Sequence, residues 1–326
     1  MRRLLFLSTA IILSLQMMAN SLGKINETCW HDGNASFIAM EKNGVIEFQG
    51  GTLHEGGYGF KVVKGRGGKL VVLSIYEESN ISTLSGRSVS GSTIERRNID
   101  GKDLLIIKSP KGTVTDVLFR LEGGFSSVLE EQLNQQLDGV YRSRNGSEFA
   151  FDGEGRMSIG TAHDRWESYS FVEIYDTPSN ILSVFRGRDH FEFDFEQHYL
   201  KLDVVKTKNG MAWDDDPEVE TVKSMKLKKI KGVRYKGEGI WPITSVEILS
   251  SGYLEIYDAE TLRLMRNDIY ARHGYRFKNK ALFKTFKEQL WYKPFTSDAS
   301  SLKLNEIERI NLALIQNMEK IKSQDD

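Results

Sequence analysis

Alternating apolar and polar residues dominate the chain from about Cys29 to Ile230. Within this stretch, short runs of β-branched and aromatic residues alternate with polar ones, a period of two that is typical of strands with one buried face. Glycine is frequent between the runs, and turn pairs recur at Asn43-Gly44, Asp100-Gly101 and Asn145-Gly146. Such pairs favour tight hairpins. The pattern therefore predicts a region of short antiparallel strands.

The β-rich region contains an internal repeat. A shift of 111 residues places Trp30 over Tyr141 and aligns about forty positions of the two halves without a gap. The same residue then recurs at Asn34/Asn145, Ser36/Ser147, Ala39/Ala150, Gly44/Gly155, Tyr58/Tyr169 and Phe60/Phe171. A repeated spacing of aromatic residue, turn glycine and next aromatic residue predicts two copies of one structural unit.

We assign the copies to residues 22–125 and 138–231, each about the size of an ordinary domain. Each copy is expected to close into a small barrel or sandwich, because either arrangement hides the strand edges. Small barrels can enclose one ligand. Trp30 and Tyr141, however, are expected to plug the mouth of each core.

Helical periodicity appears between the copies and again at the end of the chain. Residues 126–137 carry apolar side chains on one side and predict a short connecting helix. Residues 239–326 predict a small three-helix domain. Its first helix begins after Asp258 and ends near Gly274, its second carries Leu282, Phe283, Phe286 and Leu290, and its third begins at Asn305 with a capping-box-like Glu308. The predicted fold class is therefore α+β.

The N-terminal residues 1–21 resemble a cleavable export signal. Arg2 and Arg3 precede a mostly apolar run from Leu4 to Leu15, and small residues follow at Ala19 and Ser21. The run is shorter than the ~20 apolar residues that cross a bilayer. We therefore expect a periplasmic, outer-surface or secreted protein with no transmembrane helix in its mature chain. A retained N-terminal anchor is the alternative.

Composition narrows the class of partner. The chain has 44 basic and 45 acidic residues, and loss of Arg2 and Arg3 with the signal leaves 42 against 45, or a net charge of −3. This balance does not favour nucleic acid or an anionic membrane. The single cysteine, Cys29, excludes an internal disulfide. The remaining partner classes are a cell-envelope polymer, an anionic ligand or an envelope protein.

One strand carries residue types that can bind a metal. His190, Glu192, Asp194, Glu196 and His198 alternate with aromatic residues. Neighbours on one face of a strand stand about 7 Å apart, too far for all of them to reach one ion. We therefore interpret them as a solvated strand face and expect no metal and no cofactor. The sequence also contains no GxSxG or HExxH motif, so it assigns no catalytic residue.

The C-terminal segment carries a recognisable motif. Residues 266–277 read RNDIYARHGYRF, residues 291–294 read WYKP, residues 304–308 read LNEIE, and WPITS occupies 241–245. Over about residues 239–322 the chain resembles the YARHG domain family. The resemblance implies a small extracytoplasmic helical module and supplies no reaction.

The motif suggests one candidate binding site. An aromatic-walled pocket for an anionic or sugar-like ligand would use Arg266, Tyr270, Arg272, His273, Tyr275, Trp291 and Tyr292. The alternative is structural: Tyr270 and His273 lock the turn after the first helix, and the aromatic residues fill a small core. Asp268 and Arg272 have the spacing of a helical ion pair.

These observations favour an exported, non-catalytic binding or interaction protein. An envelope hydrolase acting on cell-wall polymer is one alternative. A purely structural or assembly role is another.

Overall fold

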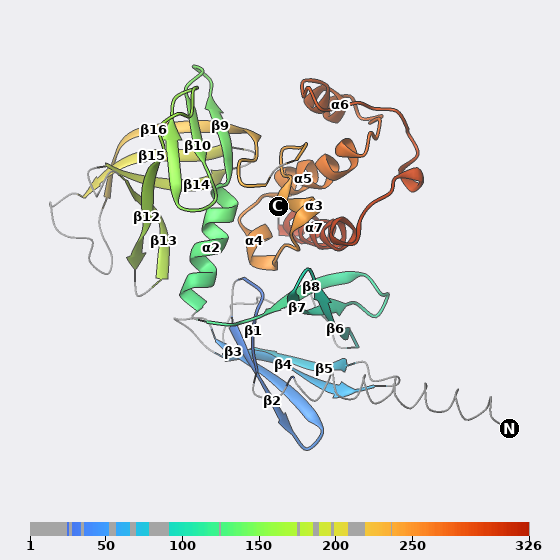
Figure 1. Ribbon diagram of the computed structural model, residues 1–326. Helices are drawn as coiled ribbons and strands as arrows, with labels where there is room; N and C mark the ends of the chain where they lie inside the picture. Colours follow the sequence, from blue (N-terminus) through green and yellow to red (C-terminus); the bar gives the residue numbers. More distant parts are fainter. Residues whose placement is uncertain are drawn as a thin grey trace. The chain divides into compact units, whose positions relative to one another are not determined.

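The computed structural model describes residues 25, 28–33, 36–51, 57–65, 70–77, 91–123, 125–174, 177–184, 189–196, 199–207, 219–235 and 237–325 (Figure 1). The predicted signal peptide and His198 lie outside these residues. The chain divides into two compact units, Met1–Phe125 and Ser126–Asp326. The α+β prediction is confirmed: two antiparallel eight-stranded barrels occur, followed by a helical region.

Barrel 1 belongs to the first unit and is a closed meander in which each strand pairs with the next. Its strands are β1 (Thr28–His31), β2 (Ser36–Lys42), β3 (Val45–Gly51), β4 (Gly57–Lys64), β5 (Leu70–Glu77), β6 (Thr93–Ile99), β7 (Lys102–Lys108) and β8 (Val114–Arg120). Pairing of β8 with β1 closes the sheet and places Arg120 opposite Trp30. Closure removes the exposed strand edges, as the repeat pattern predicts.

Side chains fill the interior of barrel 1. Trp30, Phe37 and Phe48 are fully buried in its apolar cluster, and the rings of Phe48 and Phe60 stack at 4.5 Å. Strand alternation produces this interior because every second residue points inward. At the β2–β3 turn, Asn43 and Gly44 both adopt positive φ, 55° and 77°, the conformation that tight hairpins require.

Barrel 2 repeats this order of strands in the second unit. Helix α2 (Phe125–Leu137) precedes it. Its strands are β9 (Gly139–Ser143), β10 (Glu148–Phe151), β11 (Arg156–Ile159), β12 (Glu167–Ile174), β13 (Thr177–Val184), β14 (Asp189–Glu196), β15 (Tyr199–Thr207) and β16 (Val219–Lys231). Pairing of β16 with β9 closes the barrel and places Lys229 opposite Tyr141.

Apolar and aromatic side chains also fill barrel 2. Tyr141, Phe151 and Leu202 belong to its buried cluster. On β14 the alternation predicted from the sequence is present, since Phe191 and Phe193 point into the cluster while the polar residues between them keep some exposure. Among the described residues no group of three or more His, Cys, Asp or Glu side chains is placed to hold a metal ion.

The helical region comprises α3 (Ile243–Val246), α4 (Ser251–Glu255), α5 (Ala259–Arg272), α6 (Lys280–Lys287), the 3₁₀ turn η2 (Ala299–Ser301) and α7 (Glu306–Asp325). The three longest, α5, α6 and α7, lie where the sequence predicts helices, and the two short ones come before them. One expectation was wrong: α6 ends at Lys287, so Leu290 lies beyond it and is 99% exposed. No helix in the described part of the chain is long and apolar enough to span a bilayer.

Side-chain caps fix the ends of these helices. The Asp258 carboxylate accepts the Thr261 N–H at the start of α5. At α7 the predicted capping box is present: Asn305 Oδ1 accepts the Glu308 N–H at 2.8 Å, and Glu308 Oε2 accepts the Asn305 N–H at 2.9 Å. Caps of this kind satisfy amide groups that have no partner inside the helix.

Helix α2 contacts both barrel 2 and the helical region. Asn134 Oδ1 accepts the Tyr169 hydroxyl of β12 at 2.7 Å, and the Gln136 amide donates to the carbonyls of Gly252 and Tyr253 in α4. Asp138, directly after α2, accepts the amides of Val233 and Arg234. These bonds join the end of barrel 2 to the helical region within one unit.

Candidate functional site

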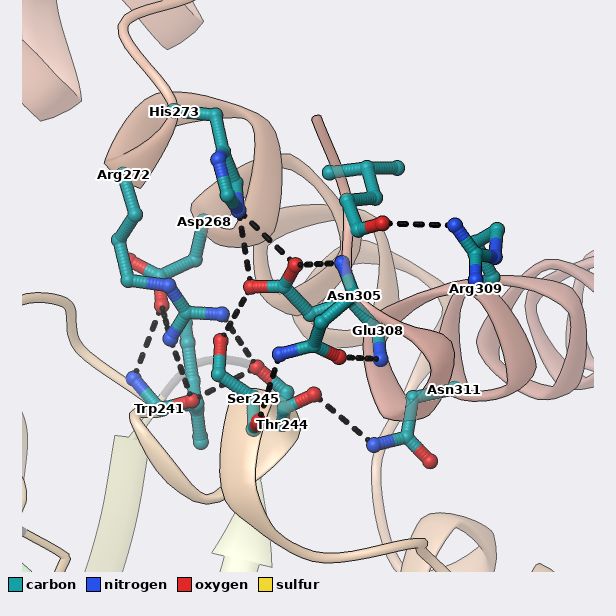
Figure 2. Close-up of polar contacts among 11 residues, drawn as sticks. Trp241, Thr244, Ser245, Asp268, Arg272, His273, Asn305, Glu308, Arg309 and Asn311 are labelled. Atoms are coloured by element: carbon teal, nitrogen blue, oxygen red, sulfur yellow. Dashed lines mark hydrogen bonds and ion pairs between the residues drawn. The ribbon is translucent and has the colours of Figure 1, made fainter. Parts of the chain in front are cut away.

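The polar residues of the C-terminal motif form a network at one end of α5 (Figure 2). Asp268 is completely buried, and its carboxylate accepts the backbone amides of Ile240 at 2.9 Å and Trp241 at 3.1 Å. Burial raises the pKa of Asp268, while the charge of Arg272 and the two amides oppose that rise. Asp268 therefore anchors the segment before α3 to α5.

Arg272 completes this anchor. Its Nη1 lies 3.1 Å from the Asp268 carboxylate and donates to the Trp241 carbonyl at 2.8 Å, and its Nη2 donates to Thr244 Oγ1 at 2.6 Å. Gly239 has a φ of +116°, and a Cβ there would lie 2.7 Å from Arg272 Cδ. Glycine is thus required where this backbone passes over the ion pair.

His273 joins the same network to α7. Its Nε2 lies 2.9 Å from the Glu308 carboxylate, which also accepts the Ser245 hydroxyl at 2.6 Å. Burial opposes ionisation of Glu308, but the hydrogen bonds of Ser245, His273 and the Asn305 amide outweigh it and hold the Glu308 pKa below its ordinary value of 4.5. Glu308 therefore holds three segments together as a carboxylate.

Asn311 has a comparable role that the sequence analysis missed. It is fully buried on α7, where its amide donates to the carbonyls of Thr244 and Glu247 and its oxygen accepts the Leu249 amide. A buried asparagine that satisfies three backbone groups fixes the loop around α3. Its sequence signal is a polar residue on the apolar face of α7, between Ile310 and Leu314.

The structure separates the seven predicted site residues into three places. Arg272 and His273 lie in the polar network described above. Arg266 forms a two-contact ion pair with Glu319 of α7, at 2.7 and 3.1 Å. Tyr270, Tyr275, Trp291 and Tyr292 belong to a chain of touching rings that also includes Phe277 and Phe286. In this chain the Tyr292 hydroxyl donates to the Tyr275 carbonyl at 2.7 Å.

Such contacts agree with the alternative given for the motif, in which its residues lock a turn and fill a small core. Ligand binding at the seven residues stays a prediction. None of them lines the pocket that the described residues form elsewhere in the second unit.

This pocket, here called the junction pocket, lies between barrel 2 and the helical region. It is lined by Tyr141, Phe195, Tyr199, Leu200 and Lys229 of the barrel and by Trp241, Tyr257 and Thr261 of the helical region. Its empty volume of about 280 Å³ includes solvent outside its open mouth, so the enclosed space is much smaller. Aromatic walls around few polar groups are typical of ligand sites.

Lys229 supplies the cationic group of the junction pocket. Its ammonium lies 5.6 Å from the centre of the Tyr141 ring, a cation–π distance. Gly139 makes room for it: a Cβ at Gly139 would lie 2.7 Å from Lys229 Cε. Part of the residue remains exposed, and burial around its ammonium lowers the Lys229 pKa to about 8.

The tyrosines beside Lys229 do not neutralise it. Burial raises the pKa of Tyr141 and of Tyr257, so both hydroxyls stay protonated and neutral where Lys229 is charged. Asp138 and Asp268 are the carboxylates whose charge acts on the Lys229 ammonium, and both favour its charged form. The junction pocket therefore presents an ammonium group among neutral rings.

The sequence analysis missed Lys229 and assigned Tyr141 to the core. Tyr141 is indeed 98% buried, yet its ring also forms one wall of the pocket. The available signal was strand alternation: Lys229 is two residues after the buried Leu227 and so points inward on β16. A partly buried lysine on the same face as the buried Leu227 indicates a special environment.

Comparison with known proteins bears only on the C-terminal segment. The family model of the YARHG domain matches residues 240–320. No family matches the residues before them. The comparisons with curated proteins and with solved structures gave no match. The predicted resemblance is therefore confirmed for the segment that contains the polar network and one side of the junction pocket.

Proposed function

We propose that this chain is an exported, non-catalytic binding protein of the cell envelope or extracellular space, and that the junction pocket is its ligand site. The N-terminal pattern of residues 1–21 and the YARHG match at 240–320 support export. The pocket supports binding.

One observation carries the binding function. Buried apolar clusters occupy the described part of both barrel interiors, whereas the junction pocket opens between barrel 2 and the helical region. Side chains from two differently folded parts of the unit converge there around one ammonium. Ligand sites occur preferentially where structural parts meet and combine apolar walls with a few polar groups.

A fragment screen tests the binding function without assuming a ligand. The mature full-length chain is mixed with a set of small organic acids, amines, sugars and neutral aromatics, and binding is detected by saturation-transfer NMR. Thr261→Met narrows the pocket because Thr261 is a buried wall residue. Thr285→Met makes the same change on the exposed side of α6 and serves as the control.

We expect fragments that bind the unchanged chain and Thr285→Met but not Thr261→Met. Matching circular dichroism and melting of the two variants separates a blocked pocket from a misfolded one. The proposal fails when no fragment binds, or when binding survives in a folded Thr261→Met variant.

Export is tested by fractionation. The expected mature chain lacks residues 1–21 and is found outside the cytosol, which N-terminal sequencing of each fraction determines. Full-length protein that retains Met1 in the cytosol would contradict the proposed location.

A scaffold role is the second candidate, and the polar network favours it. Arg272, His273 and Asp268 all bond to other parts of the helical region, as a module with a purely structural role requires. A scaffold would recruit a protein partner and bind no fragment in the junction pocket. The same screen therefore distinguishes the two functions.

A further inference from the structure

We propose that the junction pocket takes a small organic anion, a carboxylate attached to a single flat ring, and that Lys229 is its counter-ion. This inference rests on the proposed binding function and names the class of ligand.

The first argument concerns the charge of Lys229. The carboxylates that act on its ammonium electrostatically are Asp138 and Asp268. Each already has hydrogen-bond donors: Asp138 accepts the Val233 and Arg234 amides, and Asp268 accepts two amides and pairs with Arg272. Their charge is thus shared with other groups, and a ligand carboxylate would give Lys229 a direct partner.

The second argument comes from the repeat. Position by position, Gly139 of barrel 2 corresponds to Thr28 of barrel 1 through the 111-residue shift. In barrel 1 Thr28 has a hydroxyl at this strand position, and it accepts the Trp30 indole N–H at 2.7 Å. In barrel 2 Gly139 has no side chain, and the stem of Lys229 enters the space that this leaves. The second copy thus lacks the hydroxyl that the first copy has at this strand position, and the Lys229 stem passes there instead.

The third argument concerns shape. Rings form most of the wall, and Phe195 meets Tyr257 edge to face at 5.4 Å. A flat ring packs well against such surfaces. The volume of about 280 Å³ includes solvent outside the open mouth, so the enclosed part is small. We therefore assign a single ring to the pocket and no larger ligand.

Benzoate and benzamide are the probes, because they share a ring and differ in charge. Each is titrated at pH 7 into the mature full-length chain, Lys229→Met and Lys228→Met, with binding followed by NMR. Lys228 is the neighbouring, exposed lysine of β16 and provides the matched control. We expect benzoate to bind the unchanged chain and Lys228→Met at least about tenfold more tightly than it binds Lys229→Met. Benzamide should bind all three weakly.

A second measurement uses the unchanged chain alone and does not depend on the folding of a variant. Trinitrobenzenesulfonate reacts with deprotonated amines, and mass spectrometry reports its reaction at each lysine. We expect benzoate to slow labelling of Lys229 and to leave labelling of Lys228 unchanged.

Two outcomes would overturn the inference and leave the binding function standing. One is equal binding of benzoate and benzamide that survives Lys229→Met. The other is absence of benzoate binding and of Lys229 protection while other fragments bind in the pocket. Absence of every fragment would instead remove the proposed function itself.

Discussion

Barrel 1 and barrel 2 place an aromatic ring at the same position, Trp30 on β1 and Tyr141 on β9, and a cation opposite it on the last strand. In barrel 1 the cation is Arg120, whose guanidinium lies 5.5 Å from the centre of the Trp30 ring. In barrel 2 it is Lys229, at 5.6 Å from the Tyr141 ring. Both barrels thus close with a cation opposite the ring, while the duplication that the sequence repeat predicts stays a prediction.

The surroundings of the two ring–cation pairs differ. A second arginine, Arg96, also lies over Trp30 and forms two hydrogen bonds with Asp103. Trp30 itself bonds to Thr28. Tyr141 faces Gly139 and an ammonium without such a carboxylate, and residues of the helical region cover it. The ring of barrel 1 is therefore enclosed, and we call barrel 1 the closed copy. The ring of barrel 2 borders the junction pocket, and we call barrel 2 the open copy.

Removing the ring from the closed copy should have the largest effect. Trp30→Ala leaves a cavity in a filled interior and is expected to lower the free energy of unfolding by about 3–5 kcal/mol. Trp166→Ala, at a partly exposed position outside the strands, is the control and should cost much less. Urea unfolding followed by circular dichroism measures both. Equal losses would show that Trp30 does not support barrel 1.

Arg272→Lys tests the helical region that covers Tyr141 of barrel 2. Lysine keeps the charge but cannot reach the Trp241 carbonyl and Thr244 together as the planar guanidinium does. We expect a loss of about 2 kcal/mol in the second unit, from two hydrogen bonds of a charged group. Ligand binding in the junction pocket should weaken as well, because Trp241 is both a wall residue and a partner of Arg272.

Arg309→Lys is the matched control for this change. Arg309 donates to the Leu304 carbonyl at an exposed position of α7, so its replacement should leave stability and binding nearly unchanged. An Arg272→Lys variant as stable as Arg309→Lys would mean that the polar network does not hold the helical region together.

The sequence predicted the architecture better than the site, for a physical reason. Strand alternation, turn pairs such as Asn43-Gly44 and the cap at Asn305 are local patterns, and local geometry follows from them. The junction pocket instead depends on residues about a hundred positions apart, such as Tyr141 and Trp241. Only the closed barrel and the docked helices bring those side chains together.

The motif illustrates the same limit at short range. Its spacing predicted the Asp268–Arg272 pair, which the structure confirms. It did not predict that Thr244 and the Trp241 carbonyl would use the remaining donors of Arg272. Without knowledge of those partners, the sequence does not show whether Arg272 binds a ligand or bonds within the protein.

The space beside Lys229 is tested by Gly139→Ala. A side chain at Gly139 meets Lys229 Cε and the Lys231 carbonyl at 2.7 and 2.8 Å, and its φ of +148° disfavours any residue with a Cβ. We expect a loss of about 1–2 kcal/mol from strain together with displacement of the ammonium. Benzoate binding, measured by NMR, should fall with it.

Gly146→Ala separates the effect of backbone strain from the effect of displacing the Lys229 ammonium. Gly146 has a φ of +89° with no atom near its missing Cβ, so the substitution introduces strain without crowding Lys229. It should reduce stability to a similar extent and leave binding intact. Loss of binding in both variants would assign the effect to strain in barrel 2 and not to the position of Lys229.

The smallest expected effect is a rise in stability between about pH 8 and pH 10.5, to which Lys229 of the open copy contributes. The Lys229 pKa is about 8 in the folded chain against an ordinary value of 10.5. Between these values the unfolded chain binds more protons than the folded one, so the free energy of unfolding should rise with pH. Partial exposure of Lys229 screens the shift, and we expect the free energy of unfolding to rise by about 1 kcal/mol between these two pH values.

Urea unfolding at several pH values should show this rise in Lys228→Met and not in Lys229→Met. An identical rise in both would place the titrating group elsewhere, and Lys229 would then be an ordinary surface lysine with no need of an anionic partner.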